Sequence, residues 1–223
     1  MIFLSLFLLS FFIAFWFKRE LKQFPNKINQ QIFKDLHSLV ELPFNFSQLL
    51  ENSALKSKQK DHSFLFFILF PISTVLFYHH SLFIIAIVIL LIYLSLLDYH
   101  YYLTDSYYVA MIFFFSLCEL LFFQPLLIEL HLTTLIFITL FFALFIPITE
   151  KMMKKNALGS GDVILFIALS PLFSLTEMLS LLLFSSLFGL CFSSLYWLIN
   201  RKKLIKLPFI PFISLACVGI LML

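Results

Sequence analysis

Charged residues, glycine and cysteine are all scarce in this chain of 223 residues. Charged residues make up 12% of it and apolar residues 62%, and the mean hydropathy is +1.04. This balance excludes an ordinary soluble domain. It predicts an all-α, polytopic membrane protein, because a segment that crosses a bilayer as a helix needs about 20 mostly apolar residues.

The three cysteines, Cys118, Cys191 and Cys217, stand far apart within apolar runs. They have no paired spacing that would indicate a disulfide framework and no grouping that is typical of a zinc site. We interpret them as small apolar residues inside helices and expect no metal site.

The apolar residues fall into about eight runs, which we interpret as transmembrane helices. They lie near residues 1–17, 63–79, 81–97, 106–123, 126–149, 162–174, 177–199 and 208–223. The first run has no basic residue before it and no small-residue cleavage site after it, so we expect a retained anchor and not a signal peptide. Because the sequence shows no internal repeat and no glycine- or serine-rich linker, it predicts a single membrane domain over residues 1–223.

The basic residues predict the topology. All 15 lysines and arginines lie in three segments, residues 18–62, 150–161 and 200–207. Eight alternating spans put these segments on one side, and the positive-inside rule places that side in the cytoplasm and both termini outside. The 98–105 connection falls on the same side. The net charge of +3 is then a topology signal, and we expect no nucleic acid partner because no aromatic-basic platform accompanies it.

Residues 18–62 form the one extended polar region, and part of it carries apolar residues at helical spacing. These residues are Ile28, Ile32, Phe33, Leu36, Leu39 and Val40, and Pro43 ends the pattern. The spacing predicts an amphipathic helix within a cytoplasmic loop between the first two spans. Two interpretations stay open: the helix packs over the ends of the spans, or it is a docking surface for a substrate segment.

Two aspartates are the main candidates for chemistry. Asp98 ends the run 81–97, where the negative end of a helix dipole disfavours an anion, so it is either a functional acid or a side chain that reaches out to water. Asp162 follows Gly159-Ser160-Gly161, which uses two of the four glycines and permits a close backbone approach. The alternative for Asp162 is a helix N-cap, which is the interpretation that we prefer for Asp105.

Both candidates fall on the same predicted side of the membrane, so their carboxylates are expected to converge from separate connections. Two carboxylates that share one proton hold a water between them, one acting as base and the other as acid, which is the chemistry of aspartic proteases. No Ser/His/Asp set competes. His100 alone lies near these acids, and we interpret it as an interfacial loop residue; Glu119, deeper in its run, receives no role.

These residues resemble the type IV prepilin peptidase family of GxGD membrane aspartyl proteases, particularly its short, competence-type members. The resemblance is carried by Asp98, by Gly159-Ser160-Gly161-Asp162 and by Pro208-Phe209-Ile210-Pro211. It implies eight helices, with Asp98 and Asp162 as the catalytic pair and with Gly159 and Gly161 shaping the loop that brings Asp162 to the substrate. The implied activity is cleavage of the basic leader from type IV prepilin or pseudopilin precursors, at the cytoplasmic face of a bacterial inner or plasma membrane, in pilus assembly, competence or protein secretion.

The chain departs from the family's pattern in three places. Thr104-Asp105 stands where Pro-Asp is usual, so Asp105 inherits no role, and Ile210 stands where glycine is usual. Residues 18–62 lack the two Cys-x-x-Cys pairs that resemble a zinc site in many members. Those members also N-methylate the new N-terminus with S-adenosylmethionine. For this chain the resemblance implies a peptidase that needs no cofactor and no zinc, and it leaves methyl transfer open.

Two other classes of function compete with a peptidase. A small transporter or channel would use intramembrane acids such as Glu119 as an ion path. A non-catalytic scaffold of a membrane complex would use its acids only as helix caps or surface charges.

Overall fold

The computed structural model describes residues 2–39, 45–53, 55–56, 62–153, 159–201 and 206–223, and within these ranges every regular element is helical. The all-α expectation is therefore confirmed for this part of the chain. The chain divides into two compact units, Met1–Pro71 and Ile72–Leu223, which are described separately.

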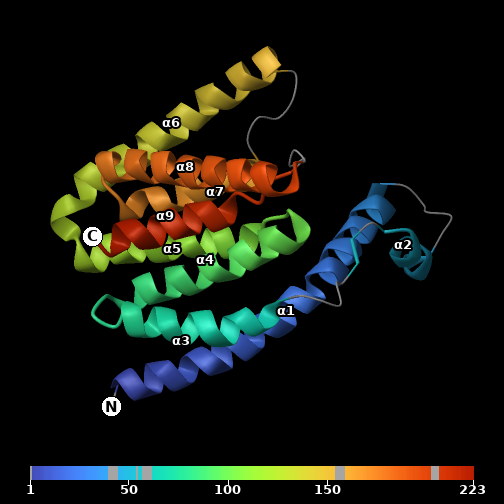
Figure 1. Cartoon of the computed structure of the whole chain (residues 1–223), viewed down its shortest axis with the longest axis horizontal. Coiled ribbons are helices and arrows are strands. Elements are labelled where there is room, and N and C mark those ends of the chain that lie inside the picture. The colour runs from blue at the N-terminus through green and yellow to red at the C-terminus, as the bar shows by residue number, and fades with distance from the viewer. Residues whose placement is uncertain (1, 40–44, 54, 57–61, 154–158, 202–205) are drawn as a thin grey trace. The chain divides into compact units, whose positions relative to one another are not determined.

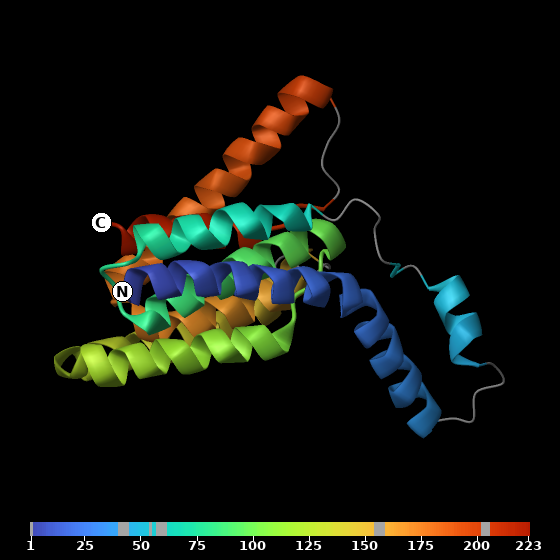
Figure 2. The ribbon, with the colours of Figure 1, turned by 90° about the horizontal axis from the view of Figure 1, so that it is seen from below.

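The first unit is built on one long helix, α1 (Ile2–Leu39), followed by α2 (Phe46–Asn52), η1 (Ser63–Leu65) and the start of α3 (Phe66–Leu76). The 38 residues of α1 correspond to a length of about 57 Å, which is well beyond the roughly 30 Å thickness of a hydrocarbon core. The expected first span and the expected amphipathic helix are thus parts of a single helix. Pro25 lies inside it and accounts for the bend in α1 that Figure 2 shows, because proline removes a helical hydrogen bond.

The polar half of α1 packs against the segment that follows it. Asn29 is 2% exposed, and its side chain donates to the Leu55 carbonyl at 2.9 Å and accepts from the Ser53 hydroxyl at 2.8 Å. The Phe33 ring meets that of Phe46 in α2 at 5.6 Å. Asn29 and Phe33 thus contact this segment, whereas Ile32 and Leu36 of the predicted apolar face are 42% and 41% exposed. Val40 and Pro43 lie outside the described residues.

The second unit contains six main helices that form a closed ring. They are α4 (Leu82–Tyr101), α5 (Ser106–Phe123), α6 (Ile128–Met153), α7 (Ser160–Leu169), α8 (Leu175–Asn200) and α9 (Ile210–Leu221), with short turns η2 (Pro125–Leu127) and η3 (Ser170–Leu172). The main contacts between these helices follow the order α4, α5, α7, α6, α8, α9 and back to α4, and Figure 1 shows the helices side by side. Most of α4 is buried, so α4 supplies much of the core of this unit.

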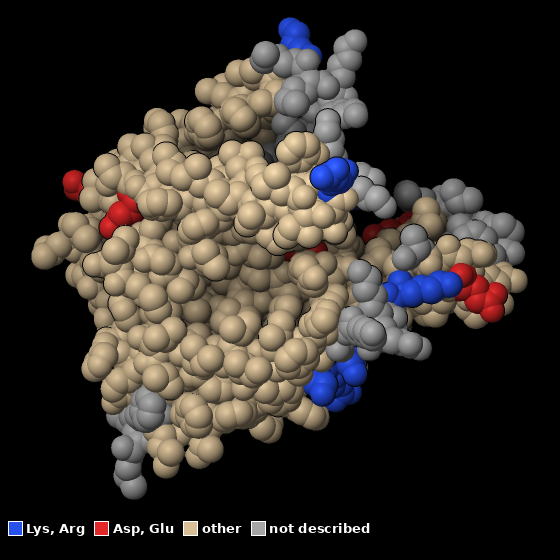
Figure 3. All heavy atoms as spheres, in the orientation of Figure 1, with Lys and Arg blue, Asp and Glu red and all other residues tan. Residues whose placement is uncertain are grey.

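Four helical segments of the described chain are long and apolar enough to cross a membrane: Leu82–Tyr101, Ser106–Phe123, Pro125–Thr149 and Leu175–Asn200. The shorter apolar helices are Ser63–Leu76, Ser160–Leu172 and Ile210–Leu221. Membrane helices are thus supported, whereas the expected number of eight spans is not confirmed. Figure 3 shows a face over the second unit with few charged side chains, as a lipid-facing surface requires.

Alternating helix directions bring four helix ends to one end of the second unit. Helix α4 ends here, and α5 begins here after a connection of only four residues. It returns along α6 to begin α7, and along α8 to begin α9. The end of α4 and the beginnings of α5, α7 and α9 therefore lie together, and the residues of the candidate site come from these four ends.

Candidate active site

Asp98 lies in the last turn of α4 and is only 8% exposed. Its carboxylate Oδ2 accepts a hydrogen bond of 3.1 Å from the backbone N–H of Ile210, the first residue of α9. The beginning of a helix carries free N–H groups and a partial positive charge. The α9 N-terminus therefore compensates for the unfavourable position of Asp98 at the negative end of α4, and the alternative of a side chain reaching out to water does not hold.

Asp162 lies in the first turn of α7 and is partly exposed. The N-cap of α7 is Gly159, whose carbonyl accepts hydrogen bonds from the N–H groups of Asp162 and Val163 at 3.1 and 3.3 Å. Asp162 is therefore three residues past the cap, and the alternative in which it is itself the N-cap does not hold. Its carboxylate lies against Gly159.

Both glycines of Gly159-Ser160-Gly161-Asp162 stand where a side chain would collide. A Cβ on Gly159 would lie 2.8 Å from Oδ2 of Asp162, and a Cβ on Gly161 would lie 2.1 Å from Oγ1 of Thr104. Neither glycine has a positive φ. Space for neighbouring atoms, and not an unusual backbone angle, therefore explains both glycines.

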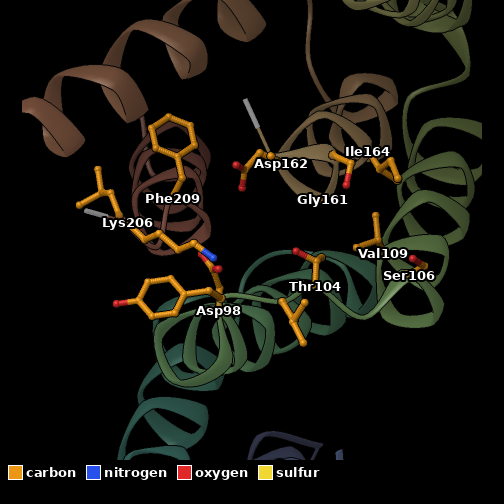
Figure 4. Close-up of a pocket in the computed structure, with 14 residues that line it drawn as sticks. Asp98, Thr104, Ser106, Val109, Gly161, Asp162, Ile164, Lys206 and Phe209 are labelled. Atoms are coloured by element: carbon orange, nitrogen blue, oxygen red, sulfur yellow. The ribbon is translucent and has the colours of Figure 1, made fainter. Parts of the chain in front are cut away.

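Asp98 and Asp162 line one cavity of about 990 Å³. Figure 4 shows them on different sides of it, Asp98 from α4 and Asp162 from α7. The other lining residues are Tyr102, Leu103, Thr104, Ser106, Val109, Gly159, Ser160, Gly161, Ile164, Lys206, Leu207 and Phe209. All four residues that the sequence singles out for the site thus line one cavity, with both polar and apolar side chains around the two acids.

The remaining acids that the sequence analysis considered lie outside this cavity. Asp105 is the N-cap of α5, and its carboxylate accepts from the Tyr107 N–H at 3.0 Å, which confirms the interpretation as a cap. Glu119 is 4% exposed and accepts a hydrogen bond from the Ser81 hydroxyl, which also caps α4 at Ile84. Glu119 is therefore a buried, hydrogen-bonded acid that joins α5 to the beginning of α4.

Sequence reasoning missed the contributions of Thr104, Lys206 and Phe209 to the cavity wall. The sequence marks Pro208-Phe209-Ile210-Pro211 as part of a family pattern but indicates no role for it. In the structure the Phe209 side chain lines the cavity, and the Ile210 N–H donates a hydrogen bond to the Asp98 carboxylate. A proline-rich start to a helix is a usable signal for exposed N–H groups, although not for the acid that they bind.

No group of three or more metal-ligating side chains is present among the described residues. The polar groups of the cavity suit a reaction of water between two acids.

Residues 85–194 match the family model described as the type IV leader peptidase family. The chain is also similar to a prepilin leader peptidase/N-methyltransferase of Haemophilus influenzae, with 44% identity over 64 residues, which are 29% of this chain and 26% of that protein. No solved structure matches the chain significantly. The matched region contains Asp98, Gly159, Gly161 and Asp162, and the fold brings these four residues to one cavity. Over residues 85–194, which are just under half of its length, the chain is therefore similar to the type IV leader peptidase family.

Proposed function

We propose that this chain is a membrane aspartic endopeptidase that removes the leader peptide from type IV prepilin or pseudopilin precursors. The observation that carries the proposal is the shared cavity of Asp98 and Asp162, two acids that are 64 residues apart in the chain and come from different helices. Both lie in the segment that matches the type IV leader peptidase family. The prepilin leader peptidase to which the chain is similar supports the choice of substrate, although the match covers only about a quarter of that protein.

In this proposal Asp98 and Asp162 share one proton and hold a water between them. The ionised carboxylate takes a proton from the water as the water oxygen bonds to the scissile carbonyl carbon. The protonated carboxyl gives its proton to the carbonyl oxygen. The resulting tetrahedral species then breaks at its C–N bond: the leaving amine takes the proton that the first carboxylate accepted from water, and a hydroxyl of the tetrahedral species returns a proton to the second carboxylate. No covalent enzyme intermediate forms. Gly159 and Gly161 shape the loop that brings Asp162 to the peptide.

We place the cavity on the cytoplasmic side of a bacterial inner or plasma membrane. The beginnings of α7 and α9, which supply half of its wall, directly follow two of the three segments that contain every lysine and arginine. Such segments are retained in the cytoplasm. Lys206, from the third segment, lines the cavity itself. Both termini then lie outside, and the substrate is a precursor whose apolar helix shares the bilayer.

The proposal is tested by expressing the chain together with a pilin-like precursor in cells that lack their own leader peptidase. Cleavage is measured as the shift of the precursor to its mature size, for the wild type and for the Asp98→Asn and Asp162→Asn variants. We expect mature pilin only with the wild type, because each variant lacks one of the two groups that exchange protons. Mature pilin in equal amount with either variant would contradict the proposal.

The same cells measure the second activity that the family resemblance leaves open. Methyl transfer adds the mass of one methyl group to the N-terminus of the mature pilin, which mass spectrometry detects. The proposal made here is limited to cleavage, and methyl transfer stays open until this mass is measured. Glu119, on which a transporter would depend, is hydrogen-bonded to Ser81 and does not line the cavity.

A further inference from the structure

We infer that Thr104 is a positioning residue of the proposed peptidase. In this inference the Thr104 side chain packs against the beginning of α7 and limits how closely α7 approaches. This contact thereby sets the position of Asp162 relative to Asp98. The inference depends on the proposed function, since it concerns the geometry of the same two acids.

The contact between Thr104 and Gly161 is the closest approach at any described glycine. A Cβ built on Gly161 would lie 2.1 Å from Oγ1 of Thr104, 2.6 Å from its Cβ and 3.3 Å from its Cγ2. The backbone at Gly161 therefore rests directly on the Thr104 side chain. Because Asp162 is the next residue, any displacement of Gly161 is passed directly to the carboxylate.

The backbone around Thr104 is restricted in its movement. Thr104 lies in the four-residue connection between α4 and α5, and a hydrogen bond fixes each end of this connection. The N–H of Tyr102, in the left-handed region with φ 53°, donates to the Asp98 carbonyl at 2.8 Å. The Asp105 carboxylate caps α5 through the Tyr107 N–H at 3.0 Å. A threonine side chain also has few rotamers, so it does not yield easily to a larger neighbour.

The connection thus links the two acids mechanically. One end of it is hydrogen-bonded to the Asp98 backbone, its middle carries Thr104, and Thr104 meets Gly161 beside Asp162. Figure 4 shows Thr104 at the cavity wall between the helices that carry Asp98 and Asp162. A displacement of about 1 Å in such a site lowers the rate of the chemical step about 100-fold. Thr104 would therefore affect kcat strongly and substrate binding little.

The experiment compares leader cleavage by the full-length protein in proteoliposomes for the Gly161→Ala, Thr104→Gly and combined Gly161→Ala/Thr104→Gly variants. Gly161→Ala should lower kcat about 100-fold, with KM within about threefold of the wild type. The combined variant should recover at least about tenfold over Gly161→Ala, because removal of the Thr104 side chain makes room for the new methyl group. Gly219→Ala in α9 is the matched control and should leave kcat unchanged, since no atom lies within 4 Å of its Cβ.

Thr104→Val separates a steric role from a chemical one, because valine keeps the shape of threonine and removes the hydroxyl. We expect kcat within about threefold of the wild type for Thr104→Val and a loss of about tenfold for Thr104→Gly. This pair also decides the matter if Gly161→Ala does not accumulate in the membrane.

Three results would overturn the inference while wild-type cleavage stands: a combined variant no more active than Gly161→Ala, a Thr104→Val variant as impaired as Thr104→Gly, or a fully active Thr104→Gly variant. Absence of cleavage by the wild type itself would instead reject the proposed function.

Discussion

At the scale of single residues, the candidate site depends on which helix end each acid meets. Asp98 closes α4, where the helix dipole disfavours a negative charge, and it accepts a hydrogen bond from the first N–H of α9. Asp162 lies one turn into α7, at the positive end of its own helix. Both carboxylates thus lie near positive helix ends, which offset part of the cost of placing two acids in one cavity.

Glu119 is expected to stabilise the fold without taking part in cleavage. Glu119→Ala removes the acceptor of the Ser81 hydroxyl in a buried place and should lower the free energy of unfolding by about 1–3 kcal/mol. Glu119→Gln keeps an acceptor oxygen and should cost less. Thermal unfolding in detergent measures the difference, and cleavage per folded molecule should equal that of the wild type for both. Loss of cleavage by Glu119→Gln with an intact fold would give this acid a functional role.

The sequence was sufficient to select Asp98, Asp162, Gly159 and Gly161, because glycines and charges are rare in this chain and their positions are therefore informative. It did not reveal their partners. The Ile210 N–H is 112 residues from Asp98, and Thr104 is 57 residues from Gly161. Contacts of this kind depend on how helices pack, and a single sequence carries no periodic signal for them.

At the scale of elements, the contact between α4 and α9 is the one that sets the position of Asp98. Inside this apolar interface the Ser95 hydroxyl donates to the Ser214 hydroxyl at 2.7 Å, and Ser214 in turn reaches the Leu91 carbonyl at 3.3 Å. Small polar side chains let two helices approach closely within a membrane. The close contact places the beginning of α9 where Ile210 meets Asp98.

Enlarging Ser214 should therefore damage the site from a distance. Ser214→Leu overpacks the interface, which typically costs about 1–3 kcal/mol, and should separate the Ile210 N–H from Asp98, so both stability and kcat fall. Ser214→Ala loses the two hydrogen bonds of this hydroxyl, each worth about 1 kcal/mol, but it adds no bulk to the interface and should keep most of the activity.

The measurements are thermal unfolding and leader cleavage, with Leu215→Ala as the control because Leu215 is 58% exposed. Full kcat in Ser214→Leu would show that the α4–α9 contact does not position Asp98.

The positions of the helices could be predicted well from the sequence, and their lengths less well. Each of the eight apolar runs overlaps a helix, because runs of Leu, Ile and Phe bounded by polar residues leave few alternatives. The sequence did not indicate that α1 continues through residues 18–39, because the change from apolar to polar residues near residue 18 was interpreted as the end of the first helix. The backbone of α1 continues because Pro25 is the only strong helix breaker before Leu39.

At the scale of the whole molecule, the directions of the helices determine which acids meet. In the second unit, neighbouring helices along the chain run in opposite directions. The beginnings of α7 and α9, which follow basic segments, therefore lie at the same end of the unit as Asp98. The opposite end carries the η2 turn and the beginnings of α4, α6 and α8. The proposed topology assigns the first end to the cytoplasm.

Thiol labelling tests this topology. In a background with Cys118, Cys191 and Cys217 replaced by alanine, a membrane-impermeant maleimide should label the Leu126→Cys variant on intact spheroplasts. It should label Arg201→Cys only after the membrane is permeabilised. Both positions are exposed, Leu126 at 97%, so accessibility of the side chain does not limit either reaction. The reverse pattern would contradict a cytoplasmic active site.

The most direct test of the central claim, that Asp98 and Asp162 act as one unit, is the rate of leader cleavage in proteoliposomes by the two single asparagine variants and their combination. Asp105→Asn is the matched control, because asparagine caps a helix as well as aspartate does and Asp105 does not line the cavity. We predict that both single variants fall by at least about a thousandfold and that the double variant falls no further, as for catalytic residues that act together, while Asp105→Asn cleaves normally. Wild-type rates in either Asp98→Asn or Asp162→Asn would contradict the account.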